Sequence, residues 1–226
     1  MDRRAFGPLR LSSGARRVTP TYHPPMPLTD QLFGTFLDDV AAKTPAPGGG
    51  AVVGAVGALA AALAGMVVSY SVGKKSLAEH QPELEASVAL LARARALMLT
   101  LVEEDQSAYA LMNELQRLPP EDPRRAAQLP GVAVAATQVP LMVMAAGTDL
   151  LRHFERLASI SNRFLRSDLA IAGVLAEAVV RAGAWNVRIN LPLLAELGVM
   201  KDQAAEADRL VATARECAAR LEAACV

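Results

Sequence analysis

The polar side chains that could do chemistry lie in four short segments, separated by long apolar stretches. Lysines and carboxylates can transfer protons or hold an ionic substrate, and paired amides can orient a polar ring. A glycine triplet, Gly48-Gly49-Gly50, adds backbone N–H groups that a ligand can approach closely. The four segments are Lys74-Lys75, Glu103-Glu104-Asp105, Ser167-Asp168 and Asn186-Val187-Arg188-Ile189-Asn190.

The glycine triplet stands at the start of a run that is helical in character, as in a phosphate-binding loop. A Walker A motif, however, has its lysine directly after the glycines and a strand before them, whereas Gly73-Lys74-Lys75-Ser76 follows at the far end of the run. The sequence therefore excludes that motif. Two interpretations stay open: a contact between the helix start and an anion or carbonyl, and tight helix packing alone.

Three consecutive acids, Glu103 to Asp105, interrupt an apolar helical pattern. They cover too wide an arc of a helix to form one solvated edge, so at least one is expected to face inward, although a surface position for all three is the alternative. Asp168 is either a functional acid or, with Ser167, the N-cap of the next helix. The lysines 74 and 75 are explained equally well as cations at a helix C-terminus.

Asn186 and Asn190 are spaced i, i+4 and share one helical face, with Arg188 between them. Polar groups in such an apolar setting need partners, because an unpaired one costs several kcal/mol. They form either a satisfied structural network or a binding wall. Metal chemistry has little support: Asp149 and His153 are spaced i, i+4, but no second histidine or Glu-x-x-His partner completes a di-metal site.

The elements that must position these segments are helices. Hydrophobic residues make up 52% of the 226 residues but aromatic ones only 4%, so Ala, Leu and Val dominate. Helical periodicity predicts an all-α, single-domain helical bundle around a Gly/Ala-rich central helix, and no stretch shows sustained alternation typical of strands. The expected helices are residues 30–43, 51–70, 82–118, 124–160 (broken or kinked near Pro130 and Pro140), 168–191 and 201–224.

The central run from Ala51 to Tyr70 carries no charge and is long enough for a membrane span. Its small residues form ordered rows, which favours a buried helix, and we expect no second run of this kind and no membrane partner. Lys+Arg and Asp+Glu balance at 23 each, which argues against nucleic acid as a partner. Two cysteines fit a reduced, cytoplasmic protein. Residues 1–27 are interpreted as a disordered or mis-started arm, and residues 28–226 as the helical domain.

In their order and spacing, these segments resemble the cyclodeaminase/cyclohydrolase family. The resemblance rests on Thr44-Pro45-Ala46-Pro47-Gly48-Gly49-Gly50, the small-residue helix, and the four polar segments, and it covers about Leu28 to Val226. The family comprises bacterial methenyltetrahydrofolate cyclohydrolases and the C-terminal domain of formiminotransferase-cyclodeaminase. Its usual serine after the glycine triplet is Ala51 here, and its usual Gly-Asn-Pro-Asn is reduced to Asn162.

The resemblance implies an all-helical homodimer that acts on a tetrahydrofolate derivative and needs no cofactor beyond that substrate. It implies Asp168, Asp105 and Lys74 as catalytic groups. It also implies a substrate-binding set of Gly48, Gly49, Gly50, Lys75, Glu103, Ser167, Asn186, Arg188 and Asn190. A cyclohydrolase is expected over a cyclodeaminase, because the chain carries no formiminotransferase segment; an inactive folate-binding protein is the alternative of another class.

Overall fold

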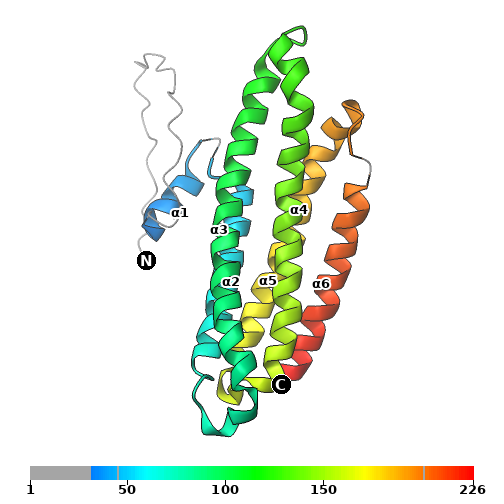
Figure 1. Ribbon diagram of the computed structural model, residues 1–226. Helices are drawn as coiled ribbons and strands as arrows, with labels where there is room; N and C mark the ends of the chain where they lie inside the picture. The colour runs from blue at the N-terminus through cyan, green and yellow to red at the C-terminus, as the bar shows by residue number, and fades with distance from the viewer. Residues whose placement is uncertain (1–31, 45, 201) are drawn as a thin grey trace, which may run out of the picture.

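A computed structural model describes residues 32–44, 46–200 and 202–226 and shows a bundle of long helices (Figure 1). Within these residues there is no strand, which confirms the all-α prediction. The helices are α1 (Phe33–Ala41), α2 (Gly49–Ser69), α3 (Gln81–Arg117), α4 (Pro123–Ile160), α5 (Arg166–Glu196) and α6 (Gln203–Cys225), with short 3-10 helices at Lys75–His80 and Arg163–Leu165. The predicted cap at Thr29-Asp30 and the arm at residues 1–27 lie outside the described part.

The bundle has α3 and α4 on one side and α2 and α5 behind them, with α6 beside α4 and α5 (Figure 1). Glycines let α3 approach α2 closely. A Cβ added at Gly54 would overlap Val102 and lie 3.1 Å from the Met98 carbonyl oxygen, and one added at Gly57 would lie 2.7 Å from the Met98 sulfur. The small-residue face of α2 therefore fixes how near, and in which register, α3 lies against it.

Helix α4 continues as one helix through Pro130 and Pro140, so of the two predicted alternatives, a break or a kink, the break is wrong. Proline lacks an N–H and leaves the carbonyl four residues earlier without its helical partner. For Pro140 that carbonyl belongs to Ala136, and it accepts a hydrogen bond from the Asn190 side-chain amide, Nδ2 to O, at 3.0 Å. A side chain from α5 thus supplies the donor that α4 lacks, and the helix remains intact across the proline.

Two predicted helix ends also differ. Ser167 and Asp168 lie inside the first turn of α5 and do not cap it. The side-chain cap in this region belongs to the preceding 3-10 helix, where Asn162 Oδ1 accepts a hydrogen bond from Phe164 N at 3.3 Å. Helix α2 ends at Ser69 because the chain turns through Gly73, whose φ of 78° suits glycine. Lys74 and Lys75 therefore follow the helix and do not complement its C-terminal dipole.

About half of the most apolar stretch of each of three long helices is buried inside the bundle. By length and composition α2, α4 and the segment containing α5 could each cross a membrane, so the expectation that the central run is unique is wrong. In α2, 56% of the most apolar window is buried against other helices.

Candidate functional site

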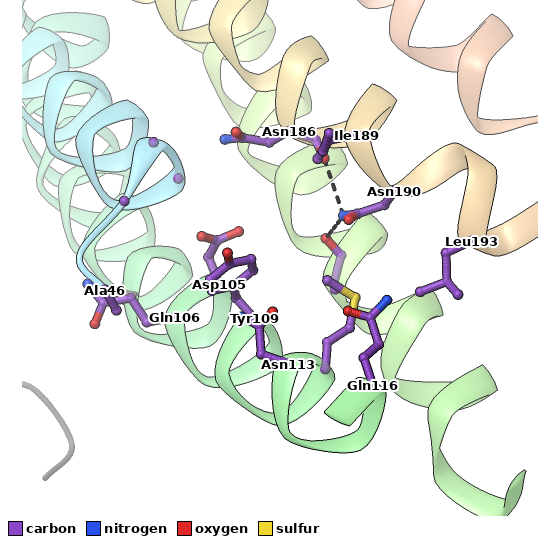
Figure 2. A pocket seen from close by; sticks show the side chains of 15 residues that line it. Ala46, Asp105, Gln106, Tyr109, Asn113, Gln116, Asn186, Ile189, Asn190 and Leu193 are labelled. Carbon is purple, nitrogen blue, oxygen red and sulfur yellow. Dashed lines mark hydrogen bonds between the residues drawn. The ribbon is translucent and has the colours of Figure 1, made fainter. Parts of the chain in front are cut away.

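A cavity of about 450 Å³ opens where the start of α2 meets the middle of α3 and the second half of α5. Residues that the sequence singled out separately meet here: the glycine triplet and Asp105 come together with Asn186 and Asn190, although they are far apart in the chain (Figure 2). The complete lining is Ala46, Gly48, Gly49, Gly50, Asp105, Gln106, Tyr109, Met112, Asn113, Gln116, Ala136, Asn186, Ile189, Asn190 and Leu193.

The Asp105 carboxyl group lies directly against the backbone of Gly50. A Cβ added at Gly50 would overlap this group, because it would lie 2.9 Å from Oδ1 and nearer still to Cγ and Oδ2. Glycine is therefore required at this position so that an acid from α3 can reach the start of α2. At the neighbouring Gly49, an added Cβ would lie 3.5 Å from the Asn186 side-chain oxygen. The Asp105 carboxyl group and the Asn186 amide therefore lie together at the start of α2.

Burial raises the pKa of Asp105 from 3.8 to about 6. A narrow crevice continues inward from Asp105 and Asn186 and is walled by Val53, Pro140 and Val143, so one side of the carboxyl group is apolar. Among the described residues, none donates a hydrogen bond to this carboxylate. Loss of hydration without a compensating donor disfavours the charged form, and the group can exchange a proton near neutral pH.

The start of α2 adds unused donors to the same cavity. Gly48 is the N-cap and has no side chain with which to cap, and the helical hydrogen bonds begin only with Val52 N to Gly48 O. The first N–H groups of a helix have no partner inside it, and they carry the positive end of the helix dipole. A carbonyl or anionic edge of a ligand would satisfy them.

Helix α3 lines the cavity with a polar row that the sequence analysis missed. Asp105, Tyr109, Asn113 and Gln116 follow each other at intervals of four or three residues and so share one face, with Gln106 beside them (Figure 2). Continuing the helical spacing onward from Asp105 would have revealed this row. Because the members that follow Asp105 are amides and a phenol, the cavity wall can recognise a heterocycle that carries both donors and acceptors.

The Asn190 side chain serves the structure and the cavity together. Its Nδ2 donates to the Ala136 carbonyl at 3.0 Å and to the Asn186 carbonyl at 3.2 Å. The structural-network interpretation therefore holds for its NH₂ group, while the residue still lines the cavity. Ala51, in contrast, is buried with Phe36 and Val102 and does not line the cavity, so the absence of a serine hydroxyl at this position does not alter the wall.

Several residues predicted for the site lie elsewhere in the chain. Glu103 is exposed, because residues two apart on a helix do not face the same way, and so only Asp105 of the three acids points inward. Arg188 lies outside the cavity in a groove between α5 and α6, where it pairs with Asp208 at 2.8 Å and stacks over Trp185 at 5.4 Å.

The remaining four, Lys74, Lys75, Ser167 and Asp168, lie at the opposite end of α2 and α5. Asp168 precedes Asn186 by five helical turns, which corresponds to about 27 Å. Within one chain these residues do not reach the cavity. No group of three or more metal-ligating side chains occurs in the described ranges, and Asp149 pairs with Arg152 at 2.8 Å.

Taken together, the fold and site define a helical-bundle protein with a carboxylate of raised pKa in an amide-lined cavity. The chain belongs to the formiminotransferase-cyclodeaminase family, whose model matches residues 33–209. It is 29% identical over 189 residues to the methenyltetrahydrofolate cyclohydrolase of Methylorubrum extorquens, covering 82% of this chain and 91% of that protein. It is 33% identical over 178 residues to the mouse formimidoyltransferase-cyclodeaminase, covering 77% of this chain but only 33% of that longer protein.

A solved structure is also similar. The formiminotetrahydrofolate cyclodeaminase of Thermotoga maritima superimposes with a TM-score of 0.80 at 30% sequence identity, over 87% of this chain and 96% of that one. Similarity over almost the whole of two relatives, each named for a reaction of a folate, confirms the family that the sequence segments resemble.

Proposed function

We propose that this chain is a methenyltetrahydrofolate cyclohydrolase, which hydrolyses 5,10-methenyltetrahydrofolate to 10-formyltetrahydrofolate. The observation that carries the proposal is the Asp105 carboxyl group, held in a cavity with a pKa of about 6 and surrounded by amides. The match to 91% of the Methylorubrum extorquens cyclohydrolase supports it.

The substrate carries its positive charge on an amidinium whose central carbon bridges N5 and N10. Hydrolysis needs water to add to that carbon and lose a proton. The bond from the carbon to N5 then breaks as N5 takes up a proton, and the new hydroxyl group loses its proton as the formyl C=O forms, so one proton is released overall. An ionised Asp105 attracts the cation, and this attraction is stronger in a cavity than in bulk water. With a pKa of about 6, the same group can accept the proton from water and return it to N5 at neutral pH.

The rest of the cavity fits a pterin, which offers donors and acceptors along one edge and flat apolar faces. Gln106, Asn113 and Gln116 can pair with the edge, and the free N–H groups at the start of α2 can donate to its carbonyl. Ile189 and Leu193 supply apolar surface from α5. In this arrangement the binding groups come from three helices and converge on Asp105.

A second candidate is formiminotetrahydrofolate cyclodeaminase activity, favoured by the likeness to the Thermotoga maritima cyclodeaminase. There N10 attacks a formimino carbon on N5 and ammonia leaves. That reaction also needs a carboxylate beside a cationic carbon and a proton for the leaving nitrogen, so Asp105 would serve both chemistries.

The two activities are separated by running two assays on the purified chain: loss of methenyltetrahydrofolate absorbance, and ammonia release from formiminotetrahydrofolate. Asp105→Asn is expected to lower turnover by roughly 10²–10⁴-fold, the usual contribution of a general acid–base group. Glu104→Gln, a change at the exposed neighbour of Asp105, is the matched control. Full activity of Asp105→Asn would refute the mechanism. Folate binding without either turnover would instead identify a binding protein.

We further propose that the chain acts in the cytoplasm as a homodimer. Support for the dimer comes from apolar side chains left exposed along α2 and α5, among them Leu59, Tyr70, Ile171 and Trp185. Size-exclusion chromatography with light scattering tests this: a mass near twice 23.8 kDa is expected, and a monomeric mass at micromolar concentration would contradict it.

A further inference from the structure

A second hollow, of about 630 Å³, lies between α5 and α6. We call it the α5/α6 groove. Its volume is in the range typical of small-molecule sites. None of its lining residues lines the cavity that holds Asp105, so the groove is independent of the proposed function. The lining consists of three arginines, a tryptophan, an aspartate and small apolar residues: Arg181, Arg188, Arg215, Trp185, Asp208, Ala178, Ala182, Val211 and Ala212.

The register of α5 against α6 determines where the charged side chains stand. The two helices run antiparallel, and Arg188 of α5 pairs with Asp208 of α6 at 2.8 Å (Figure 1). Two turns back from Arg188 along α5 is Arg181, and two turns on from Asp208 along α6 is Arg215. Arg181 and Arg215 therefore stand at the same level on the two sides of the groove, about 10 Å along the helices from the Arg188–Asp208 pair.

The groove carries more positive than negative charge at the level of Arg181 and Arg215. Arg181 has Glu177 of its own helix at 3.5 Å, and no carboxylate of the described residues lies within ion-pair distance of Arg215. The acid in the lining, Asp208, is paired with Arg188. Two like charges on opposite sides of a groove repel each other, and an anion between them removes that repulsion. Guanidinium groups match the oxygens of a phosphate in a two-point geometry.

Trp185 stands between these two levels, about one turn from each, and is 70% exposed. The Arg188 guanidinium covers one face of its ring, with Cζ 5.4 Å from the ring centroid, and Asp208 holds the same guanidinium in place. The three alanines of the lining have small side chains, which leaves room for a flat group beside the indole. An exposed aromatic side chain beside cationic groups is how many proteins stack a nucleobase.

We propose that the α5/α6 groove binds a nucleoside phosphate. The base stacks on Trp185, and its amino group donates to the Asp208 carboxylate. Oδ1 of that carboxylate pairs with Arg188, which leaves Oδ2 for the base. The phosphate groups lie between Arg181 and Arg215. The order of groups along the groove, first an acid with an indole and then two arginines, is the order of a base followed by its phosphates.

Other anions use only part of this arrangement. A nucleic acid needs a long basic stripe, whereas the arginines of the groove span about two turns and Lys+Arg and Asp+Glu balance at 23 each in the chain. Inorganic phosphate or an acidic peptide would pair with the arginines but would leave the indole ring and Asp208 without a role. A nucleoside phosphate uses every polar and aromatic group of the lining.

Calorimetric titration of the full chain, in the oligomeric state that it adopts, measures the binding. The probes are ADP, GDP and CDP, whose bases all carry an amino group, together with adenosine and pyrophosphate. Trp185 is the only tryptophan in the sequence, so its fluorescence reports on the groove. At least one of the three nucleotides is expected to bind with a Kd below about 1 mM and to quench Trp185. Adenosine and pyrophosphate should bind at least about 10-fold more weakly, because each lacks half of the contacts.

Substitutions in the groove show whether the nucleotide binds there. Arg181→Gln and Arg215→Gln should each weaken nucleotide binding roughly 10–100-fold, because each removes a charge-assisted hydrogen bond. Trp185→Leu should weaken nucleotide binding and leave pyrophosphate binding unchanged. Arg209→Gln is the matched control, because Arg209 is exposed on α6 outside the groove, and it should bind as the wild type does. All four replaced side chains are exposed, so each variant should keep the helical CD spectrum of the wild type.

Three results would overturn the inference. The first is that none of the three nucleotides binds the wild type at up to about 1 mM, whether the groove is then empty or covered by a second copy. The second is that pyrophosphate binds as tightly as the nucleotides, which would identify a site for phosphate alone. The third is that Arg209→Gln loses as much affinity as Arg215→Gln, which would show unspecific attraction to positive charge. None of these results depends on the turnover of a folate.

Discussion

Replacing Asp105 by asparagine changes the stability of the fold as well as its chemistry. The wild-type carboxyl group has its pKa raised from 3.8 to about 6 because burial removes its hydration. That difference between unfolded and folded chain corresponds to up to about 3 kcal/mol, at 1.36 kcal/mol for each pKa unit. An amide of the same shape avoids this cost, so Asp105→Asn is expected to be more stable than the wild type wherever the carboxylate is ionised.

The sign and the pH window follow from the two pKa values. Below pH 3.8 the group is protonated in both states and its burial carries no ionisation cost. As the pH rises, the unfolded chain ionises first, so the free energy of unfolding of the wild type falls until about pH 6 and is then constant. The free energy of unfolding of Asp105→Asn should therefore exceed that of the wild type by less than about 1 kcal/mol at pH 4 and by about 2–3 kcal/mol at pH 8.

Urea denaturation of both proteins at pH 4, 6 and 8 and at equal protein concentration measures this difference. Glu104→Gln provides the control, since its side chain is exposed on the same turn and the substitution should change stability by no more than about 0.5 kcal/mol at any pH. A difference between Asp105→Asn and wild type that does not grow with pH would refute the reasoning that burial dominates this site.

Other changes test the neighbouring contacts. Gly50→Ala should abolish activity and destabilise the fold, because its methyl group would overlap Asp105, whereas Gly65→Ala, with no atom near its Cβ, should be neutral or stabilising by about 0.5–1 kcal/mol; thermal melts and the absorbance assay measure both. Asn190→Leu should lower the free energy of unfolding by about 1–3 kcal/mol, because it removes a buried hydrogen bond. The loss should be smaller in a Pro140→Ala background, where residue 140 has its own N–H to donate to the Ala136 carbonyl. Equal losses in both backgrounds would contradict the inference that Asn190 replaces the donor missing at Pro140. The pH profile of kcat/KM of the wild-type enzyme should inflect near pH 6, the pKa of Asp105. A wild-type profile without this inflection would argue against a catalytic role for Asp105.

Much of the fold could be predicted from the sequence because helical periodicity is a local signal. The bounds of α2, α3 and α6 lie within a few residues of those expected, and one inward-facing acid among three followed from the arc they cover. The break that was one of the two alternatives predicted for α4 does not occur, because a proline's effect on its helix also depends on donors from neighbouring helices. The donor that repairs Pro140 belongs to Asn190, and no local rule connects two residues so far apart.

The site was only half predictable for a similar reason. Gly50, Asp105 and Asn186 meet in one cavity, but Lys74 and Asp168 lie at the other end of the same helices. Family resemblance places residues in one set without saying whether one chain or two chains supply them. The polar row of Tyr109, Asn113 and Gln116 was overlooked because each residue alone is ordinary in an exposed helix, and only the cavity shows that they act together.

The hydrogen bond from Asn190 to the Ala136 carbonyl links the interior of α4 to the wall of the cavity. A mutation of Asn190 that changes the cavity wall also removes the donor to the Ala136 carbonyl, so α4 can bend at Pro140. A mutation of Pro140 that restores the backbone N–H leaves the Asn190 amide free to bind a ligand. A substitution at Asn190 therefore changes both the cavity wall and the stability of α4. An engineer seeking a new substrate would do well to substitute Pro140 first, since the amide then becomes available without loss of the helix that supports it.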